Sequence, residues 1–251
     1  MNVDISGPRI LLSIPRLGGF VLTESVVVTW VVMAVLLLIC RYLTRNLEVR
    51  PTKKRQVIAE WAVTQIQGMV KNDMGGSFES TDYVPFIGAL FALSAGCSIS
   101  SVFAVKAPTS DLSTVLGWAI VVFILITYNK IKYNGFFGYL KGFTEPVFVM
   151  TPMNLISEIA TPLSMTFRHF GNIVSGTVIT ALIYAGLSVL SNAVLGLIPG
   201  AIGRTLSQIP ILSLGLPAIL SLYFDFFSSF MQAFIFCTLT MVYIGGAAGN
   251  E

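Results

Sequence analysis

An arginine lies within a long and almost uncharged stretch of this sequence. Between Pro146 and Asn250 the only formal charges are Glu158, Arg168, Arg204 and Asp225. An arginine at mid-membrane costs about 2.5–3.5 kcal/mol on insertion scales, and its guanidinium does not deprotonate to escape that cost. The plainer alternatives are snorkelling to the inner interface or a structural tie between two helices. The uncharged sequence far beyond Arg168 favours a fixed positive charge facing a polar pathway.

Polar residues share a helical face with this arginine. At about 100° per residue, Asn172 lies about 40° from Arg168 and Ser175 about 20° to the other side. Thr161 and Ser164 continue the stripe toward the N-terminus. Such a stripe can also serve as a plain helix–helix contact, but the arginine in its middle favours a pathway for ions.

The last apolar segment carries a second polar stripe, formed by Ser221, Asp225, Ser228, Ser229 and Gln232. Asp225 is another ionisable group deep in apolar sequence, which makes it a functional candidate. The alternative is a structural ion pair with Arg168. Two facing helices, one with a permanent cation and one with an acid, describe an ion path.

Two further titratable residues allow alternative interpretations. His169, the only histidine, lies about 100° around the helix from Arg168, so a core histidine is favoured over a proton shuttle. Glu158 could line an access path or stabilise the helix N-terminus. No cofactor or metal site is expected, because Cys40, Cys97 and Cys237 lie in apolar stretches without metal-ligand spacing. The sequence also lacks a Walker loop, HExxH and GxSxG, so no catalytic site is expected.

The composition requires a membrane for these residues. The chain has 251 residues, of which 55% are hydrophobic and 11% are charged, and its mean hydropathy is +0.81. Soluble domains are about 25% charged. The few charges of this chain cannot cover the surface of a water-soluble globule of 27.2 kDa. A scattered net charge of +3 gives no support for a nucleic-acid partner. The chain is therefore expected to be an all-α integral membrane protein in contact with the lipid bilayer.

Five membrane-spanning helices are predicted, since a crossing needs about 20 mostly apolar residues. They cover about 20–43, 83–105, 112–129, 158–192 and 208–246, and an amphipathic interfacial helix covers about 55–72. The piece 146–157 is too short to cross and is expected to lie flat or re-enter. Without repeats or a separable soluble part, residues 1–251 are expected to form a single membrane domain.

Lysine and arginine predict the orientation of the chain. The two connections after the first and third spans hold ten basic residues, and the opposite side holds four. Because basic residues concentrate in cytoplasmic loops, we expect the N-terminus outside and the C-terminus in the cytoplasm. Short connections favour a bacterial plasma membrane.

Three motifs resemble a known family. Arg168-His-Phe-Gly-Asn172 follows Pro162 by six residues, Gln232-Ala-Phe-Ile-Phe236 continues to Tyr243, and Tyr83-Val-Pro-Phe86 opens the second span. Together they are similar to subunit a of the F-type ATP synthase, the stationary ion-conducting subunit, and its five-span plan fits almost the whole chain.

The resemblance implies a role for each motif. Arg168 would meet a carboxylate on the rotating ring of c subunits, with Asn172 and Gln232 as polar neighbours, and the two long, tilted C-terminal helices would face that ring. Two offset half-channels would carry ions, most simply protons, and couple their flow to ATP synthesis in the separate catalytic headpiece. Peripheral-stalk b subunits would be further partners. Residues that could line the pathway are Glu158, Ser164, His169, Ser175, Thr177, Ser228 and Ser229.

Two positions depart from the commonest family pattern. Many members carry glutamate where this chain has Thr177, and histidine where it has Asp225. An acid lost from one helix and gained on the other would keep one carboxylate in the outer half-channel. The competing hypothesis is a secondary transporter that binds an anionic substrate through Arg168. Such folds usually show internal repeats and broken helices in both halves, and this sequence shows neither.

Overall fold

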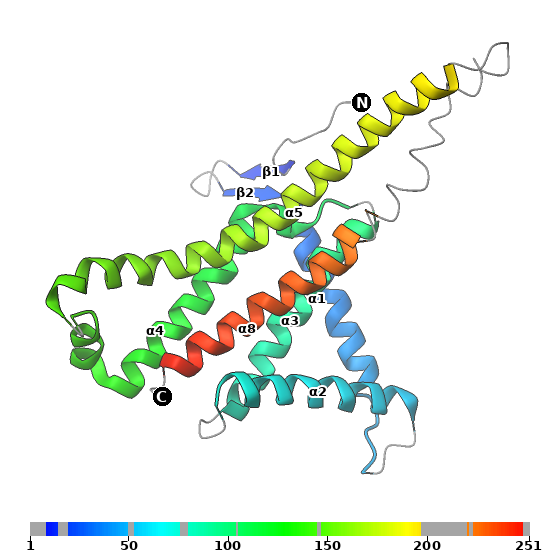
Figure 1. The fold of residues 1–251 in the computed structure, drawn as a ribbon. Helices are drawn as coiled ribbons and strands as arrows, with labels where there is room; N and C mark the ends of the chain where they lie inside the picture. The colour runs from blue at the N-terminus through cyan, green and yellow to red at the C-terminus, as the bar shows by residue number, and fades with distance from the viewer. Residues whose placement is uncertain are drawn as a thin grey trace.

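The structure, a computed structural model, describes residues 9–14, 20–49, 53–75, 80–103, 105–144, 147–196, 220 and 223–247. Helices dominate this part of the chain (Figure 1), in the order α1 Glu24–Leu43, α2 Lys54–Asp73, α3 Val84–Ile99, α4 Leu112–Gly142, α5 Thr151–Gly196 and α8 Ser229–Ala247. Short 3₁₀ turns lie at η2 Ser80–Tyr83, η3 Ser100–Phe103, η4 Pro108–Ser110 and η5 Phe148–Met150. The expectation of an all-α membrane protein is confirmed.

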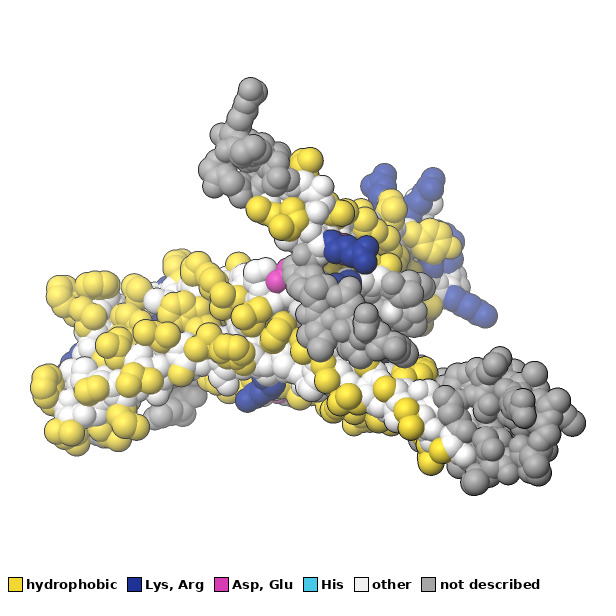
Figure 2. All heavy atoms as spheres, turned by 90° about the horizontal axis from the view of Figure 1, so that it is seen from above, with side chains coloured by type: hydrophobic (Ala, Val, Ile, Leu, Met, Phe, Trp, Pro, Cys, Tyr) yellow, Lys and Arg dark blue, Asp and Glu magenta, His cyan; other side chains and the backbone are white. Residues whose placement is uncertain are grey.

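Apolar side chains cover the outside of the helices. Four segments are long and apolar enough to cross a membrane: Glu24–Leu43, Leu112–Gly142, Phe148–Ser191 and Phe226–Ala247. The apolar helix α3 is shorter. Hydrophobic side chains dominate the face seen in Figure 2. Such a surface would be costly to expose to water, whereas lipid tails solvate it.

A small antiparallel hairpin precedes the first helix, a feature that the sequence analysis did not anticipate. Strand β1 Ile10–Ile14 pairs with β2 Phe20–Thr23, with Leu12 opposite Leu22. The amide of Glu24 donates to the carbonyl of Arg9 at 2.9 Å. The hairpin is thereby tied to the start of α1, which begins four residues later than the predicted first span.

Helix α4 begins at a side-chain cap and continues beyond the predicted span. The Asp111 carboxylate accepts from the Ser113 amide at 3.1 Å, which satisfies one of the free amides at a helix start. The helix reaches Gly142, with a kink at Gly135, where φ is +71°. A side chain is strained at that angle and glycine is not. Lys130, expected just beyond the span, therefore lies within the helix.

Helix α5 is too long to cross a membrane upright. Its 46 residues extend about 69 Å at 1.5 Å per residue, against about 30 Å of hydrocarbon. It contains Pro162 and follows a bent course in Figure 1. Residues 146–157, expected to lie flat or re-enter, include η5 and the first turns of this helix.

The last helix enters through an irregular turn. Residues Tyr223–Ser228 form a π-helix, here called η6, which leads into α8. Most of the remaining part of the predicted 208–246 span lies outside the described residues. Such wide turns are rare and are found often at functional sites.

A shared core joins α2, α3, α4, α5 and α8. It contains Val70, Met74, Ile87, Leu90, Ala119, Val122, Ile126, Met165, Phe236, Cys237, Met241, Ile244 and Ala247. At one end of this core the C-terminus of α2 lies directly against α8. A Cβ atom added at Gly245 would come within 3.0 Å of the Cα atom of Met74. This packing anchors α8, and thus Gln232, against the rest of the bundle.

Candidate functional site

Arg168 on α5 and Gln232 on α8 line the same narrow crevice. The crevice is too narrow to hold a water molecule, and its walls comprise Met165, Arg168, His169, Gln232, Ile235, Phe236 and Leu239. Arg168 is exposed and Gln232 is half-buried. No described carboxylate lies within ion-pair distance of this guanidinium; the Asp225 side chain lies outside the described side chains. The charge that the sequence singled out is thus presented at the surface of the helix pair.

A direct hydrogen bond connects the two predicted polar stripes. The Asn172 amide nitrogen donates to the Ser228 hydroxyl at 2.6 Å, which ties α5 to the π-helix η6. One turn further along α5, a Cβ atom at Gly176 would lie 3.3 Å from the ring of Phe224. Asp225 belongs to the same π-helix. The backbone of the predicted acid therefore lies in the element that contacts the arginine helix.

Two smaller polar residues of the α5 stripe, Ser164 and Ser175, are exposed beside Arg168. Thr177 is also exposed, but it lies about 180° around the helix from Arg168. The Ser175 hydroxyl donates to the Gly171 carbonyl and the Thr177 hydroxyl to the Val174 carbonyl. These hydroxyls keep free lone pairs while their protons are bound within the helix. Ser229, in contrast, is buried and its hydroxyl lies 3.4 Å from the Phe224 carbonyl, so the structure removes it from the open face.

His169 lies inside the bundle, away from the face of Arg168. It is 1% exposed. Its ring meets Trp118 of α4 edge-on at 6.2 Å and Phe236 of α8 edge-on at 5.9 Å. Neither ring nitrogen makes a well-formed hydrogen bond within the described part of the chain, although the ring lies beside the backbone of Gln232. This placement agrees with a core histidine and not with a residue lining the open face.

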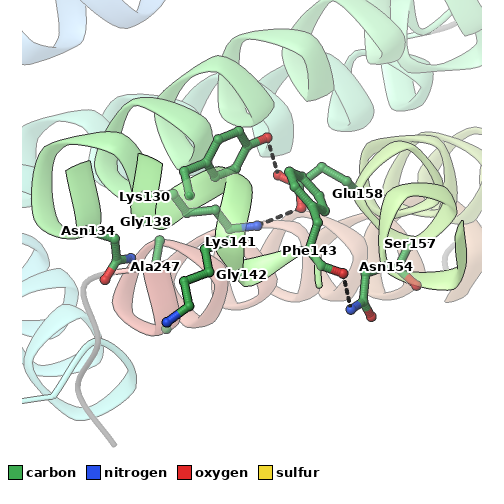
Figure 3. A pocket seen from close by; sticks show the side chains of 12 residues that line it. Lys130, Asn134, Gly138, Lys141, Gly142, Phe143, Asn154, Ser157, Glu158 and Ala247 are labelled. Atoms are coloured by element: carbon green, nitrogen blue, oxygen red, sulfur yellow. Dashed lines mark hydrogen bonds and ion pairs between the residues drawn. The ribbon is translucent and has the colours of Figure 1, made fainter. Parts of the chain in front are cut away.

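Glu158 lies at a second polar site, between α4 and α5. Its carboxylate pairs with the Lys130 ammonium at 2.6 Å and accepts a hydrogen bond from the Tyr139 hydroxyl at 3.4 Å. Figure 3 draws the contact between Lys130 and Glu158 as a dashed line. The three side chains line a cavity of about 640 Å³ that also includes Asn154 and Lys141. Glu158 lies seven residues after the start of α5, beyond the turn in which the helix dipole acts, so the helix-terminus explanation does not apply.

No sequence pattern pointed to the partners of Glu158. Lys130 is 28 residues from Glu158 along the chain. It belongs to α4 because that helix continues past the predicted end of the span at residue 129. Tyr139 and Asn154 were not predicted as partners either, because both lie in the segment between two predicted spans, which the sequence pattern describes only as a connection. The Asn154 amide donates to the Phe143 carbonyl at 2.9 Å, which closes the α4–α5 hairpin at this end.

Comparison with known proteins places this geometry in a family. The sequence matches the family described as ATP synthase A chain over residues 26–245. The chain belongs to this family. It is 33% identical over 238 residues to ATP synthase subunit a 2 of a Bradyrhizobium strain, covering 94% of this chain and 93% of that protein. It is 31% identical over 281 residues to the sodium-ion-specific ATP synthase subunit a of Propionigenium modestum, covering 98% and 86%. The subunit a of Anoxybacillus flavithermus is also 31% identical, with 90% and 92% covered.

Family membership confirms the resemblance drawn from the motifs. The chain is a non-catalytic subunit of the membrane sector of a rotary F-type ATP synthase and takes part in ion translocation. It is a multi-pass protein of the bacterial plasma membrane. Ion translocation within a synthase replaces the hypothesis of a permease that binds an anionic substrate.

Proposed function

We propose that this subunit carries protons through two offset half-channels that meet at a rotating ring of c subunits, with Arg168 between them. The observation that carries the proposal is the exposure of Arg168 beside Gln232 at the α5–α8 crevice. A permanent cation stabilises the ionised form of a carboxylate that comes close to it. A ring carboxylate arriving at Arg168 would therefore release its proton there. The same charge repels cations and blocks direct leakage between the half-channels.

The surface around Arg168 supports a ring of helices as the partner. Exposed apolar side chains flank the arginine on α5, among them Leu163 and Phe167. Phe230 and Phe234 are exposed on α8. An apolar surface with one polar stripe suits a partner that carries a single carboxylate in an apolar helix. Contact with this partner would bury the Arg168 side chain, which is exposed in this chain alone.

The two half-channels would reach this surface from opposite ends. On the inner side, the 640 Å³ cavity lined by Glu158 supports an exit path toward the cytoplasm. On the outer side, the π-helix η6 contacts the outer end of α3, where Ser98 and Thr109 form a buried hydroxyl pair at 3.3 Å. Asp225 in η6 would supply the outer acid in place of the glutamate that many relatives carry where this chain has Thr177.

The wider assembly follows from the same proposal. The N-terminus would lie outside and the C-terminus in the cytoplasm, as the basic residues predict. Peripheral-stalk b subunits would hold this chain still against the ring. The catalytic headpiece would use the torque. Sodium is the second candidate ion, because one relative that covers nearly the whole chain is named as sodium ion specific.

Ion pumping by inverted membrane vesicles tests the proposal. With the wild-type complex, added ATP should acidify the vesicle interior, with or without sodium. Arg168→Ala and Arg168→Gln should reduce pumping at least tenfold at an equal amount of assembled complex. Arg168→Lys should fail nearly as badly, because a point ammonium lacks the planar fork of the guanidinium. Normal pumping by Arg168→Ala would refute the role of the arginine, and pumping of sodium alone would replace the proton as the coupling ion.

A further inference from the structure

The buried side chain of His169 has no role in the proposed ion path. It follows Arg168 directly, yet it points into the bundle while Arg168 is exposed. The described contacts of its ring come from two other helices, through Trp118 and Phe236. His169 therefore lies where α4, α5 and α8 meet.

Both ring contacts have the geometry that aromatic rings prefer. The His169 plane stands at 80° to Trp118 and at 78° to Phe236. Edge-to-face pairs of this kind place the positive edge of one ring against the negative face of another. They depend on orientation, unlike the contacts of an aliphatic side chain. A flat ring held by two such contacts restricts rotation of α5 about its own axis.

Rotation of α5 matters because Arg168 and His169 are neighbours. A shift of one residue in register turns the helix by about 100°, which would carry Arg168 away from Gln232. On α8, Phe236 follows Gln232 by one turn, and both residues line the crevice with Arg168 and His169. The contact between His169 and Phe236 thus lies next to Arg168 and Gln232, and it would set the alignment of these two residues.

We propose that His169 is a positioning residue whose ring, held between Trp118 and Phe236, fixes the rotation of α5 so that Arg168 and Gln232 share one crevice. The inference rests on the proposed function of Arg168. It assigns His169 no proton transfer. The ring geometry, and not its polarity, is what the site requires.

Four substitutions separate ring geometry from polarity and volume. His169→Phe keeps a flat ring, His169→Leu keeps most of the volume, His169→Gln keeps polar atoms, and His169→Ala removes all three. The readout is the number of protons pumped per ATP hydrolysed, measured in vesicles and normalised to assembled complex. A purely structural defect would lower the amount of complex and leave this ratio unchanged. Thr166→Val is the matched control, since Thr166 is equally buried on α5.

We expect His169→Phe to keep at least half of the wild-type ratio, and His169→Ala to lower it at least fivefold. His169→Leu and His169→Gln should fall well below His169→Phe, and Thr166→Val should match the wild type. A wild-type ratio in His169→Ala would overturn the inference. So would a ratio retained by His169→Gln and lost by His169→Phe, because polarity would then be the requirement.

Helix alignment gives a second, independent readout. Cysteines replacing Asn172 and Ser228, in a chain freed of its three native cysteines, should be joined by a short bifunctional thiol reagent, because the native side chains lie 2.6 Å apart. The cross-linking yield should fall in His169→Ala and persist in His169→Phe. An unchanged yield in His169→Ala would contradict positioning even where pumping fails. Arg168→Ala serves as the control for function: if it pumps normally, the proposed function fails, whatever the His169 variants do.

Discussion

The Asn172 side chain of α5 donates a hydrogen bond of 2.6 Å to the Ser228 hydroxyl in the π-helix η6. This contact joins two polar stripes that are 56 residues apart in the sequence. It places the backbone of Asp225, three residues before Ser228, in the turn that contacts the arginine helix. The outer acid proposed for the ion path therefore has a defined element to hold it.

Replacing that acid should stop ion-driven synthesis. Asp225→Asn removes the only carboxylate between Glu158 and the C-terminal Glu251, so we expect at least a fivefold loss of ion-driven ATP synthesis in membrane vesicles. Adding Thr177→Glu should restore part of the activity, because it returns a carboxylate to α5 one residue from Gly176, which packs against Phe224 of the π-helix. Full activity in Asp225→Asn alone would leave this residue as a packing element and the outer path without an acid.

The inner site should respond to the charge of its two partners. Glu158 and Lys130 form an ion pair at 2.6 Å, and their side chains are 14% and 30% exposed. Removing one partner leaves a charge in a partly buried place, which we expect to cost about 1–2 kcal/mol of stability, between the values for exposed and buried pairs. Lys130→Met should therefore lower the melting temperature of the complex.

Restoring the pair with reversed signs provides the control. Lys130→Glu alone should be more harmful than Lys130→Met, because two carboxylates would then repel each other. Combining Lys130→Glu with Glu158→Lys should recover most of the lost stability. If the double variant is no more stable than either single variant, the pair contributes nothing to this end of the bundle.

Close packing of α2 against α8 makes a sharp prediction at one glycine. A methyl group at Gly245 would lie 3.0 Å from the Cα atom and 3.2 Å from the carbonyl oxygen of Met74. Backbone atoms cannot move aside as the end of a side chain can, so Gly245→Ala should force α2 and α8 apart. We expect a loss of about 1–3 kcal/mol, seen as lower assembly and a lower melting temperature. Gly246→Ala is the matched control, because a methyl group there meets nothing within 4 Å.

The polar face around Arg168 could be predicted because it depends on one number, the helical repeat. Arg168, Ser164 and Ser175 share a face for any straight helix through this segment, and the structure presents all three to the outside. The fold class followed as directly from the scarcity of charges. The same periodicity indicated that His169 points elsewhere.

Other features depend on contacts that periodicity does not encode. The pairing of Lys130 with Glu158 needs α4 to continue past its apolar part and to fold back at Gly135 and Phe143 onto α5. The length of α5 was underestimated because hydropathy measures where a helix can lie in lipid, not where it begins. The π-helix before Ser229 packs against Gly176, where an added Cβ atom would lie 3.3 Å from the ring of Phe224. No local signal in Tyr223–Ser228 specifies that wider turn.

Labelling from the two sides of the membrane tests the proposed orientation. Lys54 begins the helix α2 and is exposed, and Val105 lies beyond the opposite end of α3 and is 38% exposed. A single cysteine at position 54 should react with an impermeant thiol reagent only in inverted vesicles, and one at position 105 only in intact cells or right-side-out vesicles. The native Cys40, Cys97 and Cys237 must first be replaced. Thr109 is unsuitable as the outer site, because it is fully buried against Ser98. Labelling of position 54 from outside would reverse the orientation, and with it the assignment of the Glu158 cavity to the cytoplasmic exit.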